Sequence, residues 1–160
     1  MINIIAAIGK NKELGKDNKL LWYISEDMER FKKLTMNKVV IMGRKTYESL
    51  PEKFRPLPNR INIIITKNRA WTPLGCTICH SIEEAIDKAK EFNKEIFIIG
   101  GASIYQQGIK YTDKLYLTLI DKIYPEADAF FPDYSRFTKV ISEEDYNSKD
   151  YAFKFIELEK

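Results

Sequence analysis

Five short runs of apolar residues, separated by segments with helical spacing, constrain the fold of this chain more than any other feature. The runs are apolar almost throughout, which is typical of strands buried on both faces of a parallel sheet. Their alternation with helical segments is typical of α/β proteins. The runs are residues 2–8 (INIIAAI), 39–42 (VVIM), 61–66 (INIIIT), 95–101 (EIFIIGG) and 114–120 (KLYLTLI).

The remaining segments complete the predicted fold. Helices are predicted at residues 26–35, 44–50, 82–92 and 102–108, loops at 9–19 and 51–59, and an antiparallel pair of strands at 137–143 and 151–158. We expect an α/β, doubly wound, mostly parallel central sheet of about eight strands, with an antiparallel C-terminal hairpin and helices on both faces. Because no linker or repeat interrupts the pattern, residues 1–160 are predicted to form a single domain.

Composition argues against several classes of partner. The net charge is only +3, which gives no strong footprint for nucleic acid or a membrane surface. The first apolar run has no basic region before it and no cleavage site after it, and it is too short to span a bilayer. We therefore expect a cytoplasmic protein, and its mild positive charge slightly favours small anionic ligands.

The segment CTICH, residues 76–80, matches the pattern for covalent haem attachment. It also has the character of a short strand, in which Cys76 and Cys79 would point to opposite faces. The two thiols could not then converge on a haem or a metal, and a zinc site would lack a fourth ligand nearby. We expect no metal and no redox role here.

Asp27 lies on the apolar side of a predicted helix for which Ser25 is the predicted N-cap. An acid in the first turn complements the helix dipole, which is one structural interpretation. However, an unpaired buried carboxylate costs several kcal/mol, so Asp27 requires a partner. Because Trp22, Met28 and Phe31 border it, we favour the polar anchor of an apolar ligand pocket.

Two predicted strands end in turns that suit phosphate binding. In Gly43–Thr46 (GRKT), two cations occupy a first helical turn, where the dipole prefers anions. Gly100–Ser103 (GGAS) has small residues that let a phosphate approach the backbone. The first turn could also be a solvated basic patch. Two such turns in one sheet nevertheless suggest a ligand with several phosphates, such as a dinucleotide.

Seven segments together resemble the dihydrofolate reductase family, from Ile2 to about Tyr134. They are IIAAIGKNKELGKDNKLLW, SEDMERFK, VVIMGRKTYESL, RPLPNRINIII, IIGGASIY, LYLTLID and FFPDY. The resemblance implies an NADPH-dependent oxidoreductase that reduces 7,8-dihydrofolate to 5,6,7,8-tetrahydrofolate by hydride transfer. It also implies a role in one-carbon metabolism and in thymidylate and purine synthesis, binding of antifolate inhibitors, and a monomer.

By this resemblance, Asp27 accepts hydrogen bonds from the pterin ring, and Thr118 supports the acid. No side chain is implied beside the pterin N5, so water supplies that proton while Asp27 favours the protonated ring. Arg60 is implied to bind the glutamate α-carboxylate. The implied catalytic residues are Asp27, Trp22, Tyr105 and Thr118.

The resemblance also implies two sets of binding residues. The substrate set is Ile5, Ala7, Asp27, Met28, Phe31, Leu50, Arg55, Leu57, Arg60, Ile99 and Thr118. The NADPH set is Ala7, Leu14, Gly15, Asn18, Lys19, Gly43, Arg44, Lys45, Thr46, Thr66, Lys67, Ile99, Gly100, Gly101, Ala102, Ser103, Ile104 and Tyr105. The segment from Leu14 to Lys19 is implied to be a mobile loop that closes over the nicotinamide. A cis peptide bond is implied between Gly100 and Gly101.

The chain departs from the family pattern at Leu21 and Ser25, where prolines are usual. We expect this difference to affect the closing loop and inhibitor affinity more than the reaction. One alternative is a pyrimidine reductase of riboflavin synthesis, which shares this fold but should not need Asp27 and Arg60 together. Another is a non-enzymatic module that binds nucleotides or nucleic acid, which predicts clustered basic and exposed aromatic residues.

Overall fold

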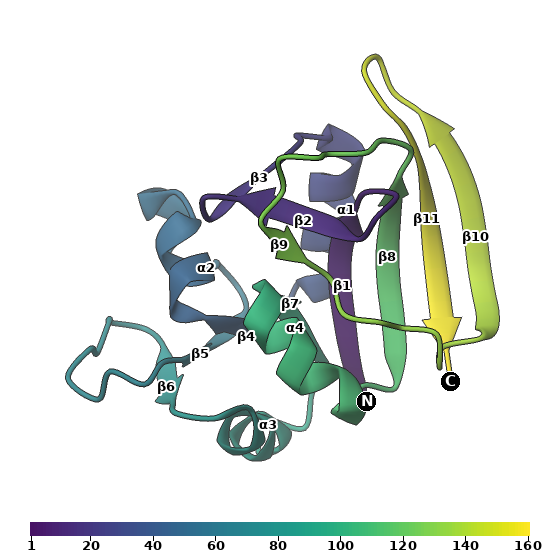
Figure 1. Cartoon of the computed structure of the whole chain (residues 1–160). Helices are drawn as coiled ribbons and strands as arrows, with labels where there is room; N and C mark the ends of the chain where they lie inside the picture. The colour runs from purple at the N-terminus through teal and green to yellow at the C-terminus, as the bar shows by residue number, and fades with distance from the viewer.

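A computed structural model describes all residues, 1–160, as a large sheet of eight strands, a small sheet of three strands and four α-helices (Figure 1). The strands of the large sheet are β1 (Ile2–Ile8), β4 (Val39–Gly43), β5 (Ile61–Ile65), β6 (Thr77–Cys79), β7 (Ile96–Gly100), β8 (Lys114–Ile120), β10 (Lys139–Asn147) and β11 (Ala152–Glu159). The helices are α1 (Ser25–Thr35), α2 (Arg44–Ser49), α3 (Ile82–Lys90) and α4 (Ala102–Gly108), with short 3₁₀ turns η1 (Glu52–Phe54) and η2 (Ile109–Tyr111).

The strand order in the large sheet is β10-β11-β8-β1-β7-β4-β5-β6. Neighbouring strands from β8 to β6 pair in parallel, whereas β11 is antiparallel to both β8 and β10. The predicted fold class is therefore confirmed, including the C-terminal hairpin. From β1 the chain moves to one side of the sheet through β4, β5 and β6, and later to the other side through β8. This reversal creates the switch point at which ligands bind in open α/β sheets.

The apolar runs are continuous because the large sheet is covered on both faces. In β4, Val39 and Ile41 belong to the larger core cluster, which α3 and α4 complete. Val40 and Met42 belong to a second cluster on the other face, against which α1 packs. All four of these side chains are fully buried. Strands in this position need apolar residues at consecutive positions, which explains the pattern in the sequence.

The prediction of a loop at residues 9–19 is wrong. This segment contains β2 (Glu13–Lys16) and β3 (Lys19–Leu20), which form the small sheet together with β9 (Ala129–Phe130). Gly15 pairs with Leu20 on one side and with Ala129 on the other. These strands are short and polar, and their partner β9 is remote in sequence, so no local periodicity reveals them.

The start of α1 also corrects a prediction, because Ser25 is not its N-cap. Ser25 is the first helical residue, and the extended Ile24 before it is the N-cap, without a side-chain capping bond. Ile24 is 3% exposed and packs in a small cluster with Trp22. Burial of Ile24, rather than a polar cap, therefore determines where the chain enters the helix.

The C-terminal pair is longer than predicted and displaced along the chain. The segment predicted at residues 137–143 is β10, Lys139–Asn147, and its residues are exposed apart from Ser142. Much of this strand, including Glu143, Glu144 and Asp145, is polar. Pairing with the partly buried β11 defines it, in a register that places Glu144 opposite Phe155.

Candidate active site

The predicted acid and its predicted partner meet at the carboxyl end of the large sheet. Asp27 projects from the first turn of α1, and Thr118 is buried in β8, where it pairs with Ala7 of β1. The hydroxyl of Thr118 donates a hydrogen bond of 2.5 Å to Asp27 Oδ1. These residues are 91 positions apart in the sequence, so the tertiary fold creates the pair.

The environment of Asp27 favours its neutral form in part. Burial raises the pKa of Asp27 above its ordinary value, while the hydrogen bond from Thr118 acts in the opposite direction. A half-buried carboxyl with a single side-chain donor keeps lone pairs for a ligand, since an ionised carboxylate accepts about four hydrogen bonds. Asp27 can therefore anchor a ligand that presents several N–H groups.

Trp22 and Tyr105 occupy the same end of the sheet. Tyr105 of α4 is 5% exposed and donates a hydrogen bond of 2.8 Å to the carbonyl of Ile5 in β1. Burial raises the pKa of Tyr105 well above its ordinary value, so the phenol remains a donor. Trp22 is 6% exposed, and its indole Nε1 is buried with no hydrogen-bond partner in the chain. A ligand or a water molecule is the natural partner for such a group.

The predicted apolar walls are largely brought together. The second core cluster contains Ile5 and Leu57, and Phe31, Leu50 and Ile99 pack against it. Ala7 packs instead against the small cluster around Trp22. Met28 is the exception, since its side chain is 43% exposed and belongs to neither cluster.

The two predicted arginines form hydrogen bonds with residues in or beside this apolar wall. Arg60 is half-buried. It donates one hydrogen bond to the carbonyl of Pro58 at 2.9 Å and another to the hydroxyl of Thr35 at 3.2 Å. A guanidinium has five N–H donors, so donors remain for a carboxylate. Burial lowers the pKa of Arg60 from its ordinary value, but a guanidinium stays protonated near neutral pH. Arg55 donates to the carbonyl of Leu50 at 2.6 Å and thus holds part of the wall.

The two glycine turns at the ends of β4 and β7 fit a phosphate ligand. Gly43 and Gly101 are the N-caps of α2 and α4, and neither helix has a side-chain cap or an acidic residue in its first turn. A Cβ on Gly101 would lie 3.3 Å from Thr46 Oγ1, so a side chain there would crowd the space between the turns. Gly100 has φ of +123°, a conformation that favours glycine, and the Gly100–Gly101 peptide bond is cis as predicted. Backbone amides and the Thr46 hydroxyl can therefore contact an anion. The Ser103 hydroxyl accepts a hydrogen bond of 2.9 Å from the Gln107 side chain, and its own proton can still be donated.

The cations assigned to the cofactor are close to these turns. Arg44 forms an ion pair of 2.7 Å with Glu48 on the same helix, and its guanidinium carbon lies 5.9 Å from the ring centroid of Trp71. Lys45 and Lys67 are exposed. Thr66 is 8% exposed, and its hydroxyl accepts a hydrogen bond from the backbone of Asn68. Arg44 thus reaches a ligand only by sharing or leaving Glu48.

The predicted closing loop is the β2–β3 hairpin. Leu14 is buried in the larger core cluster, whereas Asn18 and Lys19 are exposed at the turn. A Cβ on Gly15 would lie 2.4 Å from the carbonyl oxygen of Lys19, so only glycine fits there. Ile104 and Ala102 of α4 also pack in or against the larger cluster.

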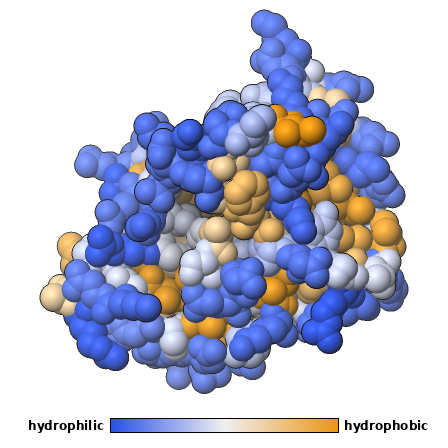
Figure 2. Space-filling model, in the orientation of Figure 1, coloured by the Kyte–Doolittle hydropathy of each residue, from blue (hydrophilic) through white to orange (hydrophobic).

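A cavity of about 520 Å³ lies elsewhere, between the loop after β1 and the β10–β11 hairpin. None of the predicted site residues lines it. Its lining includes the ion pair between Lys10 and Asp121 at 2.8 Å and lacks a buried acid. Figure 2 shows a mostly hydrophilic face with apolar side chains gathered around a hollow near its centre. The Asp27–Thr118 pair and the two glycine turns therefore lie outside this cavity.

Two residues near the site were missed by sequence reasoning. Helical periodicity alone puts Arg30 at the edge of the solvent-facing side of α1, yet it is half-buried against Phe155. Its position three residues after Asp27 was the available signal. Glu13, in the segment predicted to be a loop, is 1% exposed and accepts two backbone hydrogen bonds of 2.6 Å. No local signal distinguishes Glu13 from other loop acids.

The cysteines lie on different faces of the sheet, as predicted from the short strand. Cys79 belongs to the larger core cluster and Cys76 packs against the second cluster, and both thiols are free. No group of three or more histidine, cysteine or acidic side chains could hold a metal ion. No helix is long and apolar enough to cross a membrane.

Comparison with known proteins identifies the family. The family described as Dihydrofolate reductase matches residues 1–160. The chain is 43% identical to a dihydrofolate reductase of Buchnera aphidicola (subsp. Acyrthosiphon pisum), over 97% of this chain and 98% of that protein. It is 37% identical to a dihydrofolate reductase of Bacillus subtilis, over 100% of this chain and 95% of that protein.

A solved structure agrees with the sequence comparison. Dihydrofolate reductase from Enterococcus faecalis, complexed with NADP(H) and RAB-propyl, superposes with a TM-score of 0.89 at 29% identity, over 99% of this chain and 95% of that one. These matches favour the main interpretation over a riboflavin-pathway reductase or a non-enzymatic module. The chain belongs to the dihydrofolate reductase family.

Proposed function

We propose that this protein reduces 7,8-dihydrofolate to 5,6,7,8-tetrahydrofolate with NADPH as the hydride donor. The observation that carries the proposal is the Asp27–Thr118 pair at 2.5 Å, set among apolar side chains at the switch point of the sheet. Family membership supports the same reaction. The product would supply one-carbon units for thymidylate and purine synthesis.

The pterin ring would bind at Asp27, whose free lone pairs suit the ring N3–H and the 2-amino group. Ile5, Phe31 and Leu50 would contact the apolar part of the substrate, and Met28 would cover it from its exposed position. Arg60 would bind the glutamate carboxylate with its remaining donors. An acid and a guanidinium that both keep free hydrogen-bonding capacity, together with an apolar wall, suit a ligand with a polar ring at one end and an acid at the other.

Residues that would hold NADPH surround the two glycine turns. The amides of α2 and α4, together with Thr46 and Ser103, would contact the pyrophosphate, and Thr66 and Lys67 would contact the adenosine 2′-phosphate. Arg44 would also contact the 2′-phosphate, and its ion pair with Glu48 would then open or be shared. When bound, NADPH supplies the hydride. Ala7, Ile99 and Tyr105 would border its nicotinamide ring.

In this proposal the protein binds and orients the two ligands, and no side chain donates a proton. Asp27 as an anion would stabilise positive charge on the pterin, and water would protonate N5. Closure of the β2–β3 hairpin over the site would align the two rings. We also propose that the protein is a monomer. The free thiols of Cys76 and Cys79 suit a reducing compartment such as the cytoplasm.

The test is an assay of NADPH oxidation with dihydrofolate as acceptor, in the wild type and in Asp27→Asn. The variant should keep the fold and the affinity for NADPH but lose most of its kcat/KM at neutral pH, because the charge that favours N5 protonation is gone. Lower pH should partly restore the rate, since more substrate is then protonated in solution. Wild-type activity of Asp27→Asn at neutral pH would contradict the role of Asp27.

A further inference from the structure

Arg30 is a charged residue in the second turn of α1 whose side chain turns toward the sheet. Its guanidinium carbon lies 4.4 Å from the ring centroid of Phe155 in β11 and 5.8 Å from that of Tyr116 in β8. Side chains three positions apart on a helix are neighbours, so Arg30 adjoins Asp27. Arg30 is thus held close to the acid by aromatic packing.

The contacts of Arg30 with the sheet lie next to Thr118, the hydrogen-bond partner of Asp27. Nη1 of Arg30 donates to the carbonyl of Leu117 at 3.5 Å, and Leu117 immediately precedes Thr118. Phe155, over which Arg30 lies, pairs directly opposite Thr118 between β11 and β8. The guanidinium therefore contacts both strands at the level of the residue that bonds Asp27.

Other acids around Arg30 have partners of their own. Glu157 of β11 forms an ion pair of 3.1 Å with Lys114 of β8. Glu144 of the edge strand β10 accepts a hydrogen bond from the hydroxyl of Tyr146. Among the groups that face Asp27, Thr118 of β8 donates its hydrogen bond, Tyr105 of α4 is a protonated phenol, and Arg30 is the cation.

From this arrangement we infer that Arg30 is a positioning residue whose fixed charge keeps Asp27 anionic in an apolar pocket. The inference rests on the role proposed for Asp27. Burial raises the pKa of Asp27, and the positive charge of Arg30 lowers it. Burial also lowers the pKa of Arg30, but its guanidinium remains charged. The aromatic faces of Phe155 and Tyr116 attract that charge and hold it without neutralising it.

The test measures the titration of the Asp27 carboxyl by ¹³C NMR, in the full chain with NADPH bound. Arg30→Met removes the charge and keeps much of the apolar stem, whereas Arg30→Lys keeps the charge. The midpoint should rise by roughly 0.5–1 pH unit in Arg30→Met, as expected for the loss of one neighbouring charge in a partly screened site. In Arg30→Lys it should stay near the wild-type value. Lys33→Met, an exposed change of equal charge on the same helix, is the matched control.

Kinetics give a second readout that a packing role would not produce. A carboxyl with a higher pKa is less ionised at a given acidic pH. The loss of kcat/KM in Arg30→Met relative to the wild type should therefore grow as the pH falls through the Asp27 titration and vanish above it. NADPH affinity should be unchanged, which also shows that the variant is folded. If Arg30→Met does not fold, Arg30→Gln provides the same comparison.

The outcomes separate this inference from the proposed function. An unchanged Asp27 midpoint in Arg30→Met, or a uniform loss at every pH that lysine fails to rescue, overturns the role of Arg30 alone. Full activity in Asp27→Asn overturns the proposed role of Asp27 instead. A raised midpoint with rescue by lysine supports the inference.

Discussion

At the scale of single residues, the candidate site depends on a carboxyl that the fold both buries and supports. Burial disfavours the charge of Asp27, and the hydroxyl of Thr118 partly compensates for that cost. A hydrogen bond to a charged group contributes about 1.5–3 kcal/mol. The donor of Thr118 therefore helps to keep the acid ionised when a ligand arrives.

Thr118→Val should test this support because valine keeps the shape and removes the donor. We expect kcat/KM for dihydrofolate to fall by about 10- to 100-fold at neutral pH. The apparent pKa of Asp27 should rise, so the loss should be larger at acidic pH. The check is the pH profile of kcat/KM.

Thr112→Val is the matched control, since Thr112 is fully buried and its hydroxyl donates to Gly108 at 2.9 Å, in the connection before β8. That variant should lower stability and leave the pH profile unchanged. A Thr118→Val enzyme with the wild-type profile would show that the hydroxyl does not support Asp27.

At the scale of elements, the small sheet is the feature that local sequence does not reveal. Its strand β2 is anchored by Glu13, whose carboxylate accepts from the amides of Asn11 and Tyr124. Burial raises the pKa of Glu13, but the backbone hydrogen bonds from Tyr124, its own amide and Asn11 outweigh burial, and the net pKa is lowered. A single acid thus connects the hairpin to the loop after β8.

Glu13→Gln should destabilise this connection, because glutamine has one acceptor oxygen and would turn an NH₂ group toward a backbone N–H. The expected loss is about 2–3 kcal/mol in the free energy of unfolding at pH 7, measured with urea. An acid whose pKa is lowered in the fold stabilises the fold at pH values above the pKa of glutamate in the unfolded chain, about 4.3. This contribution disappears as the pH falls through the pKa of Glu13 in the folded state.

The difference between wild type and Glu13→Gln should therefore shrink in acid. Glu126→Gln, an exposed acid in the same loop as Tyr124, should have no such effect at either pH. Equal stability of Glu13→Gln and wild type at pH 7 would argue that the carboxylate does not anchor β2.

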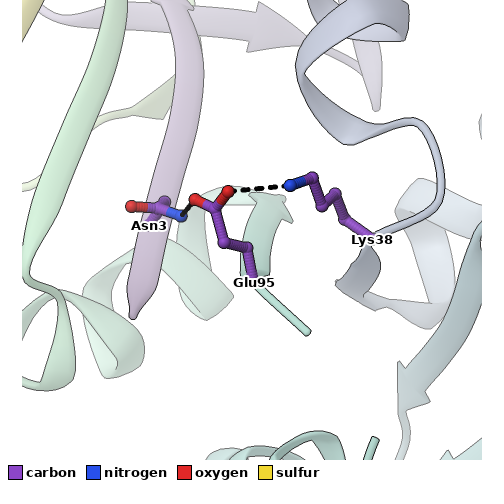
Figure 3. Close-up of polar contacts among 3 residues, drawn as sticks. All are labelled: Asn3, Lys38 and Glu95. Atoms are coloured by element: carbon purple, nitrogen blue, oxygen red, sulfur yellow. Dashed lines mark hydrogen bonds and ion pairs between the residues drawn. The ribbon is translucent and has the colours of Figure 1, made fainter. Parts of the chain in front are cut away.

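At the scale of the whole molecule, one end of the large sheet carries the candidate site and the other carries a polar network that joins its strands. Asp27, Thr118 and the glycine turns lie at the carboxyl ends of the strands. At the opposite end, Glu95 accepts a hydrogen bond of 3.2 Å from the buried Asn3 of β1 and pairs with Lys38 at 2.8 Å (Figure 3). This network joins the starts of β7, β1 and β4, which are neighbours in the sheet.

Glu95→Gln should therefore separate stability from activity. The hydrogen bond with Lys38 contributes most to lowering the pKa of Glu95, so the network is strongest when the acid is charged. We expect a loss of about 1 kcal/mol in unfolding free energy at pH 7 and little change in kcat/KM. Urea unfolding and the NADPH oxidation assay measure the two quantities.

Glu91→Gln breaks an exposed ion pair with Lys88 on α3 and should cost less than Glu95→Gln. If kcat/KM in Glu95→Gln fell as far as in the site variants, the two ends of the sheet would be coupled.

The central sheet and its helices are predictable from the amino-acid sequence, because strands buried on both faces need apolar runs such as VVIM and EIFII, and such runs are local. With the family resemblance, the sequence also predicted the meeting of Asp27 with Thr118. The small sheet, the burial of Glu13 and the inward orientation of Arg30 became apparent only in the folded structure. Each of these depends on partners far along the chain, such as β9 or Phe155, and polar side chains show no periodicity that predicts such partners.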